Sequence, residues 1–241
     1  MNATGIAILE HLRAVEAERA ARRSDPALGA ACLVVKERQH ERFVACYSDV
    51  LATPRWGDAA RFFLEDLYGP GDFSRRDSEF ARVVPSLVRL FPTGIVQTVA
   101  TLGELHALSE RLDTAMARAW PDPADRADDW GVDYGHAWRA VGQPEARQRQ
   151  IALMLDVGRA LDRYTRNPVL RHSLRLMRGP AQVAGLGELQ SFLENGFDTF
   201  SAMKGAEPFL GMIAQRESSL VSRLFAGQSM TVAVKGLPGR L

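Results

Sequence analysis

Helical periodicity runs through almost the whole chain and constrains its fold more than any other feature. Apolar residues recur three and four positions apart in most segments, which is the spacing of one helix face. Prolines and glycines divide this pattern, because proline removes a backbone donor and glycine tolerates left-handed caps. The pattern predicts an all-α, single-domain bundle of about eight to ten helices. We expect helices over residues 5–22, 26–51, 55–68, 74–90, 93–119, 144–166, 168–178, 180–204 and 206–226.

Two stretches lie outside this helical pattern. Residues 120–131 are rich in proline and aspartate and have no apolar period, which predicts a surface loop; whether it subdivides the domain stays open. Residues 228–241 contain two glycines and a proline and are expected to form a loose C-terminal tail. The expected helical bundle domain therefore spans residues 1–227.

Residues 61–77 combine a helix end, a stop and a new helix start. Phe63, Leu64 and Leu67 share one helix face, and Gly69-Pro70-Gly71 cannot continue that helix. Ser74 precedes Asp77 by three positions, as in a capping box.

The same stretch carries a family resemblance. Phe62-Phe63-Leu64-Glu65-Asp66-Leu67-Tyr68 resembles the motif of the FFLEELY-motif proteins, a group of bacterial proteins, with Asp66 in place of the second glutamate. The resemblance implies a helical bacterial protein and supplies no catalytic residues.

Charge and cysteine content narrow the class of protein. The net charge of +1 gives no global attraction to nucleic acid or to an anionic membrane, so neither is expected as a partner. Cys32 and Cys46 lie on one predicted helix, roughly 21 Å apart, which is too far for a disulfide. Reduced thiols, the absence of a signal-peptide pattern and the absence of a long apolar run indicate a cytoplasmic protein.

Several polar residues interrupt apolar helix faces and are the candidate site residues. His106, Glu110 and Asp113 lie on successive turns of one face, and three further residues interrupt other helices: His40, Asp66 and Asp162. If these side chains converge, imidazoles and carboxylates could hold iron or manganese inside the bundle, with His106, Glu110 and Asp113 as the candidate ligands. The chain lacks the paired Glu-x-x-His motifs of di-metal bundles. Pairing with arginines or backbone groups is therefore favoured, and no metal or other cofactor is assigned.

Three charged clusters are candidates for binding. Asp72, Arg75, Arg76 and Asp77 surround a helix start, and the two aspartates favour a salt-bridge cluster over an anion site. On the first helix, Arg13, Arg19, Arg22 and Arg23 are expected on a solvated face. Near residue 170, Asn167, Arg171, His172, Arg175 and Arg178 form a basic surface that could bind an acidic partner, although a solvated face is favoured.

These observations support one function and leave an alternative. We expect a soluble helical binding or interaction protein without catalytic activity, forming a homodimer or binding a protein partner. The alternative is a metal- or haem-dependent oxidase or oxygenase-like enzyme, with buried histidine and carboxylates as ligands.

Overall fold

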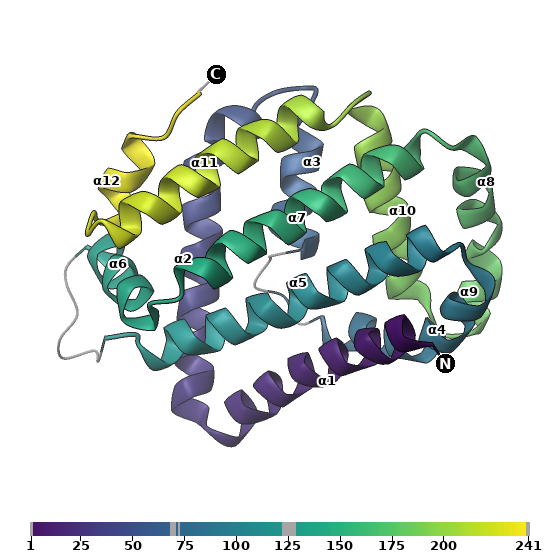
Figure 1. Ribbon diagram of the computed structural model, residues 1–241, viewed down its shortest axis with the longest axis horizontal. Coiled ribbons are helices and arrows are strands. Elements are labelled where there is room, and N and C mark those ends of the chain that lie inside the picture. Colours follow the sequence, from purple (N-terminus) through teal and green to yellow (C-terminus); the bar gives the residue numbers. More distant parts are fainter. Residues whose placement is uncertain (1, 68–70, 72, 122–128, 240–241) are drawn as a thin grey trace.

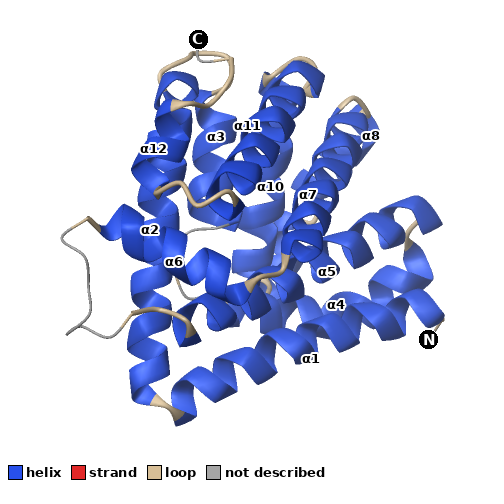
Figure 2. Ribbon diagram, turned by 60° about the vertical axis from the view of Figure 1, so that its left-hand side comes forward, coloured by secondary structure: helices blue, strands red, loops and turns tan. Residues whose placement is uncertain are grey.

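The computed structural model describes residues 2–67, 71, 73–121 and 129–239, and every element in this part of the chain is helical (Figure 2). Four long helices lie side by side in one layer (Figure 1), in the order α1 (Ala3–Ser24), α5 (Thr93–Arg118), α7 (Pro144–Thr165) and α11 (Glu207–Phe225). Behind this layer cross α2 (Pro26–Leu51), α3 (Gly57–Phe62) and α10 (Gly187–Ala202). The remaining helices are α4 (Ser74–Leu90), α6 (Trp130–Val141), α8 (Pro168–Leu176), α9 (Arg178–Val183) and α12 (Met230–Lys235).

The predicted all-α class is confirmed, with twelve α-helices in the described residues rather than about eight to ten. Helix starts at proline agree with the prediction because their signals are local. Asp25 caps α2 by accepting hydrogen bonds from the amides of Ala27 and Leu28, and Asn167 caps α8 through the amide of Val169. None of the described helices is both long and apolar enough to cross a bilayer.

The extra helices come from three regions where the prediction and the structure differ, and the first is α6, which lies outside the expected helix ranges. The single helix expected over residues 180–204 is wrong, because α9 ends at Val183 and Gly185 adopts a positive φ of 66° before α10 begins. In place of a loose tail, the last segment contains α12, which buries Met230 and Ala233. Most of the 120–131 segment lies outside the described residues.

Two apolar clusters form the interior. The larger lies between the layers, where α2, α3, α7, α10 and α11 meet, and α12 covers one end of it. The smaller joins α1, α4 and α5 through Ile8, Val84, Val96 and Ala100. Between these clusters α1, α2, α4 and α5 also bury charged side chains, and these form the polar site.

The FFLEDL segment differs from an ordinary helix. After α3 the chain continues as a π-helix over Phe63–Leu67, where a continuous α-helix over 55–68 was expected. Phe62 stacks on Phe192 of α10 with ring centroids 5.6 Å apart, and Phe63 contacts Phe200 and Phe209. The sequence carries no local signal for this wider turn, because the partners of both rings come from α10 and α11. Phe62 and Phe63 are both buried and anchor this segment in the core.

Candidate functional site

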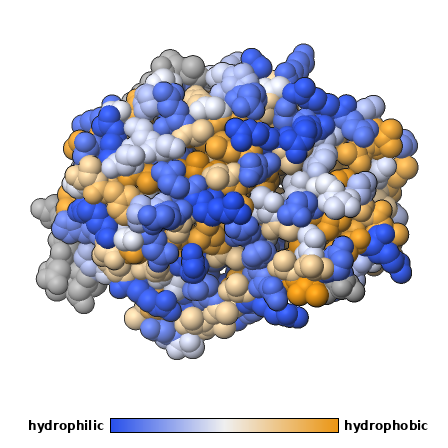
Figure 3. Space-filling view, in the orientation of Figure 1, coloured by the Kyte–Doolittle hydropathy of each residue, from blue (hydrophilic) through white to orange (hydrophobic). Residues whose placement is uncertain are grey.

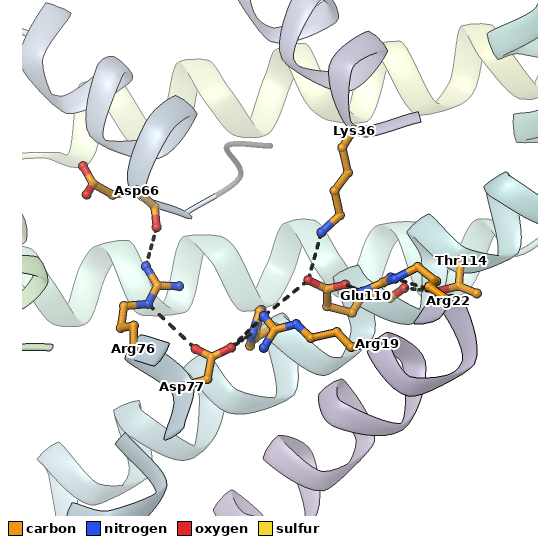
Figure 4. Close-up of polar contacts among 9 residues, drawn as sticks. Arg19, Arg22, Lys36, Asp66, Arg76, Asp77, Glu110 and Thr114 are labelled. Atoms are coloured by element: carbon orange, nitrogen blue, oxygen red, sulfur yellow. Dashed lines mark hydrogen bonds and ion pairs between the residues drawn. The ribbon is translucent and has the colours of Figure 1, made fainter. Parts of the chain in front are cut away.

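A buried ion network occupies the junction of α1, α2, α4 and α5 (Figure 4). Its centre is Glu110 of α5, whose side chain is 5% exposed. Arg22 of α1 donates to one carboxylate oxygen, and the Lys36 ammonium of α2 lies 3.0 Å from the other. Arg22 also donates to the hydroxyl of Thr114 at 3.0 Å. Glu110 therefore ties three helices together.

Asp77 of α4 is the second anion of the network. Its Oδ2 lies 2.8 Å from Arg19 Nη2 and 2.8 Å from His106 Nε2. Arg19 also approaches Glu110 at 3.8 Å, so it links the two carboxylates. This burial corrects the expectation of a solvated face for Arg19 and Arg22, since Arg19 is only 9% exposed. Carboxylates on α4 and α5, about 60 and 90 residues away along the chain, provide the partners.

Arg76 connects the network to the FFLEDL segment. Its Nη1 donates to the backbone carbonyl of Asp66 at 2.6 Å, and its guanidinium packs between the rings of Phe73 and Phe192. Its Nε lies 3.8 Å from Asp77. Figure 4 shows that the Asp66 carboxylate points away from this contact, which uses the backbone oxygen. Burial raises the pKa of the Asp66 carboxyl, and Arg76 opposes that rise.

The central carboxylates are ionised and already neutralised by protein cations. Burial alone would raise the pKa of Glu110, but Lys36 and Arg22 outweigh it and hold that pKa below the ordinary value. The pKa of Asp77 is also lowered. Burial would raise it, but the contact with His106 and the charge of Arg19 lower it by more. A metal ion at either carboxylate would have to displace these cations. Among the described residues, no group of three or more His, Cys, Asp or Glu is arranged to hold a metal ion.

Only some residues of the predicted polar cluster belong to this network. His106, Glu110 and Asp113 lie on one face of α5 as predicted, but each has a different partner; Asp113 accepts from the side-chain amide of Gln39 at 2.8 Å. Burial raises the pKa of Asp113, against the opposing charge of Lys36. His40 of α2 is half-buried and forms no hydrogen bond or ion pair with any described residue.

Asp162 lies elsewhere, beside an open surface cavity of about 360 Å³ that Ser201 and Lys204 also line. Its carboxylate already accepts hydrogen bonds from Arg166 and from the amide of Ala206 at 3.0 Å. The six candidates therefore do not converge on one cavity.

The cluster predicted around the start of α4 separates in the structure. Arg76 and Asp77 face the network, whereas Arg75 is 70% exposed and pairs with Glu79 and with Glu188 of α10. Asp72 lies outside the described residues.

The buried ion pair of Arg216 and Asp49 was not among the predicted site residues. Arg216 of α11 has no exposed side-chain surface and makes a two-pronged contact with Asp49 of α2. Its position among Phe209, Ile213 and Leu220, at helical spacing, was the available signal.

The α8–α9 face has a different character: apolar, basic and exposed. Its members are Val169, Leu176, Met177 and Val183, which are 54–93% exposed, together with the exposed Arg175. None of the nine residues of α8 is buried. Figure 3 shows apolar side chains gathered at the right-hand end of the molecule, where Figure 1 places α8. Monomeric proteins seldom leave so many aliphatic side chains exposed on one short segment.

Charge on this segment has one sign. Five arginines and no acidic residue occur between Asp162 and Glu188. Three of the five pair with neighbouring carboxylates, Arg171 with Asp198 at 2.7 Å among them. Arg163 and Arg175 form no ion pair with any described residue. The face therefore combines exposed aliphatic groups with one cation, Arg175, that forms no ion pair with a described residue.

The described residues form an all-helical protein with a buried ion network and an exposed apolar face on α8 and α9. A family model described as Domain of unknown function (DUF8198) matches residues 18–231, and the chain belongs to that family. No curated protein and no solved structure matched the chain. The resemblance to FFLEELY-motif proteins stays a prediction.

Proposed function

We propose that the protein is a non-catalytic binding protein whose α8–α9 face docks an acidic, amphipathic helix of another protein. The observation that carries this proposal is the exposure of Val169, Leu176 and Val183 on a segment that has arginines and no acid. Val169 and Leu176 are spaced seven apart on α8, which is the repeat that packs one helix against another, and Val183 extends the apolar row onto α9. A partner with an apolar row and flanking glutamates would complement both the shape and the charge.

Charge argues against the other occupants. A symmetric pair of two copies through this face would bring Arg175 beside arginines of the same segment, with no acid between Asp162 and Glu188 to receive them. A membrane surface is less favoured because α8 and α9 carry no tryptophan or tyrosine, the residues that anchor interfacial helices. The net charge of +1 also gives no attraction toward nucleic acid.

The buried network supports a role without catalysis. Glu110 and Asp77 contact cations of the protein itself, so neither carboxylate is free to act as a base or a metal ligand. The network instead ties α1, α2, α4 and α5 to one another. We also propose a cytoplasmic location in a bacterium, because Cys32 and Cys46 are buried free thiols and because of the FFLEELY resemblance.

Fluorescence anisotropy with two synthetic helical peptides tests the proposal. Both peptides are about three heptads long with a leucine row; one carries glutamates beside the row and the other carries lysines. We expect the glutamate peptide alone to bind, less tightly at higher salt. Leu176→Asp should abolish binding, whereas Val44→Asp, at an exposed apolar position on α2, should leave it unchanged.

Other outcomes would overturn the choice of partner. Equal binding of both peptides would remove the charge argument. Binding to anionic vesicles that Leu176→Asp abolishes, without peptide binding, would assign the face to a membrane. A doubled mass in solution that Leu176→Asp returns to that of one chain would assign it to a second copy.

A further inference from the structure

Arg147 is a buried cation without a counter-ion. It lies in the first turn of α7 and is 5% exposed, yet no carboxylate of the described residues lies within ion-pair distance. The other strongly buried arginines differ: Arg19, Arg22 and Arg216 each contact a carboxylate directly. An arginine does not lose its proton in proteins, so this charge stays inside the structure.

Arg147 and the neighbouring Trp138 each have one hydrogen-bond donor without an acceptor. Its guanidinium packs 3.9 Å above the centre of the Trp138 ring. Nη1 donates to the side-chain oxygen of Gln150 at 3.3 Å, but Nη2 has no partner, and neither has the indole Nε1 of Trp138. Trp138 is 6% exposed. One stacked pair therefore contributes two buried donors without acceptors, and such groups require a water or an ion.

The nearest acidic groups do not supply the missing acceptor. Asp113 accepts from Gln39, and Glu217 accepts from Arg42 at 3.0 Å and from Tyr47 at 2.9 Å. Burial raises the pKa of the Tyr134 hydroxyl, so this neighbour stays neutral. Arg42 adds a second cation close to the same tyrosine.

The N-terminus of α7 also favours a negative charge near Arg147. Gln143, the residue before α7, gives no side-chain hydrogen bond to the first turn, and the dipole of a helix N-terminus favours an anion. Both Arg147 and Trp138 are more than nine-tenths buried, so the occupant must be small.

We propose that Arg147 and Trp138 bind a small inorganic anion of chloride size. The guanidinium Nη2 and the indole Nε1 are its donors, and the anion completes the charge balance between α6 and α7. This inference is independent of the α8–α9 face.

Bromide crystallography and halide-dependent unfolding test the site. In crystals of the whole protein grown in bromide, we expect an anomalous peak within hydrogen-bond distance of Arg147 Nη2. In solution, replacing gluconate by chloride at constant ionic strength should raise the unfolding midpoint by a few degrees. Arg147→Met should lose this shift. Arg149→Met should keep it, since Arg149 is an exposed arginine of the same helix, paired with Glu104.

Three results would overturn the proposal. The first is electron density beside Arg147 Nη2 without an anomalous bromide signal, which would assign the density to water. The second is a chloride shift of equal size in Arg147→Met and in the unaltered protein. The third is a bromide bound only at exposed arginines. If Arg147→Met does not fold, the bromide crystal of the unaltered protein still decides.

Discussion

Replacing Glu110 by glutamine should destabilise the protein strongly. The substitution removes the only negative charge in contact with Arg22 and Lys36 among the described residues and leaves both cations inside the bundle. Removing one partner of a buried ion pair costs about 3–5 kcal/mol. Lys36 is 18% exposed, so water can solvate part of its charge, and glutamine keeps one oxygen for Arg22. We therefore expect a loss of about 3 kcal/mol, at the lower end of that range.

Urea unfolding followed by circular dichroism measures this loss, as a lower midpoint at unchanged slope. Glu104→Gln is the matched control, because Glu104 lies on the same helix and pairs with Arg149, whose side chain is 53% exposed. An exposed pair contributes about 0.5 kcal/mol. If both variants lost the same small amount, the argument that burial makes this network important would be refuted.

Two further predictions concern acid stability and helix packing. The pKa values of Glu110 and Asp77 are lowered in the folded state, so their contribution to stability is present above about pH 4 and is lost as pH falls through the folded values. Urea midpoints measured between neutral pH and about pH 2 should fall as the pH falls. In Glu110→Gln this fall of the midpoint should be smaller, because one of the two carboxylates is absent. Gly196→Ala should lower the melting temperature, with a cost of about 1–3 kcal/mol, because a Cβ atom would lie 2.9 Å from Cζ of the buried Phe62 ring. Gly211→Ala, where nothing lies within 4 Å, should raise the melting temperature; equal effects of the two changes would contradict the packing argument.

The sequence predicted the helices well where their signals are local. Prolines at positions 26, 144 and 168 mark real helix starts, because proline and the preceding cap residue act within one turn. The structure of residues 228–239 depends on contacts with distant residues. Arg216 of α11 donates to the backbone carbonyl of Gly239 at 2.6 Å, and burial of Met230 fixes α12. No local pattern in a short segment with two glycines indicates such contacts.

The candidate site was predictable as a helix face and not as a network. Periodicity placed His106, Glu110 and Asp113 on one side of α5, which the structure confirms. Their partners come from other helices, and Arg19 lies on a helix whose polar residues resemble a solvated surface. Which arginine turns inward depends on tertiary packing, so a single sequence could not distinguish Arg19 from the exposed Arg23.

A photo-crosslinking residue at position 176 tests the central claim most directly. In cells that make the protein, the account predicts crosslinks from position 176 to one segment of another protein, and that segment should have an apolar row at helical spacing flanked by acidic residues. Arg175→Glu should greatly reduce these crosslinks, and a crosslinker at position 44 should not produce them. Crosslinks to lipid, to a second copy of this chain, or to segments without acidic residues would contradict the account.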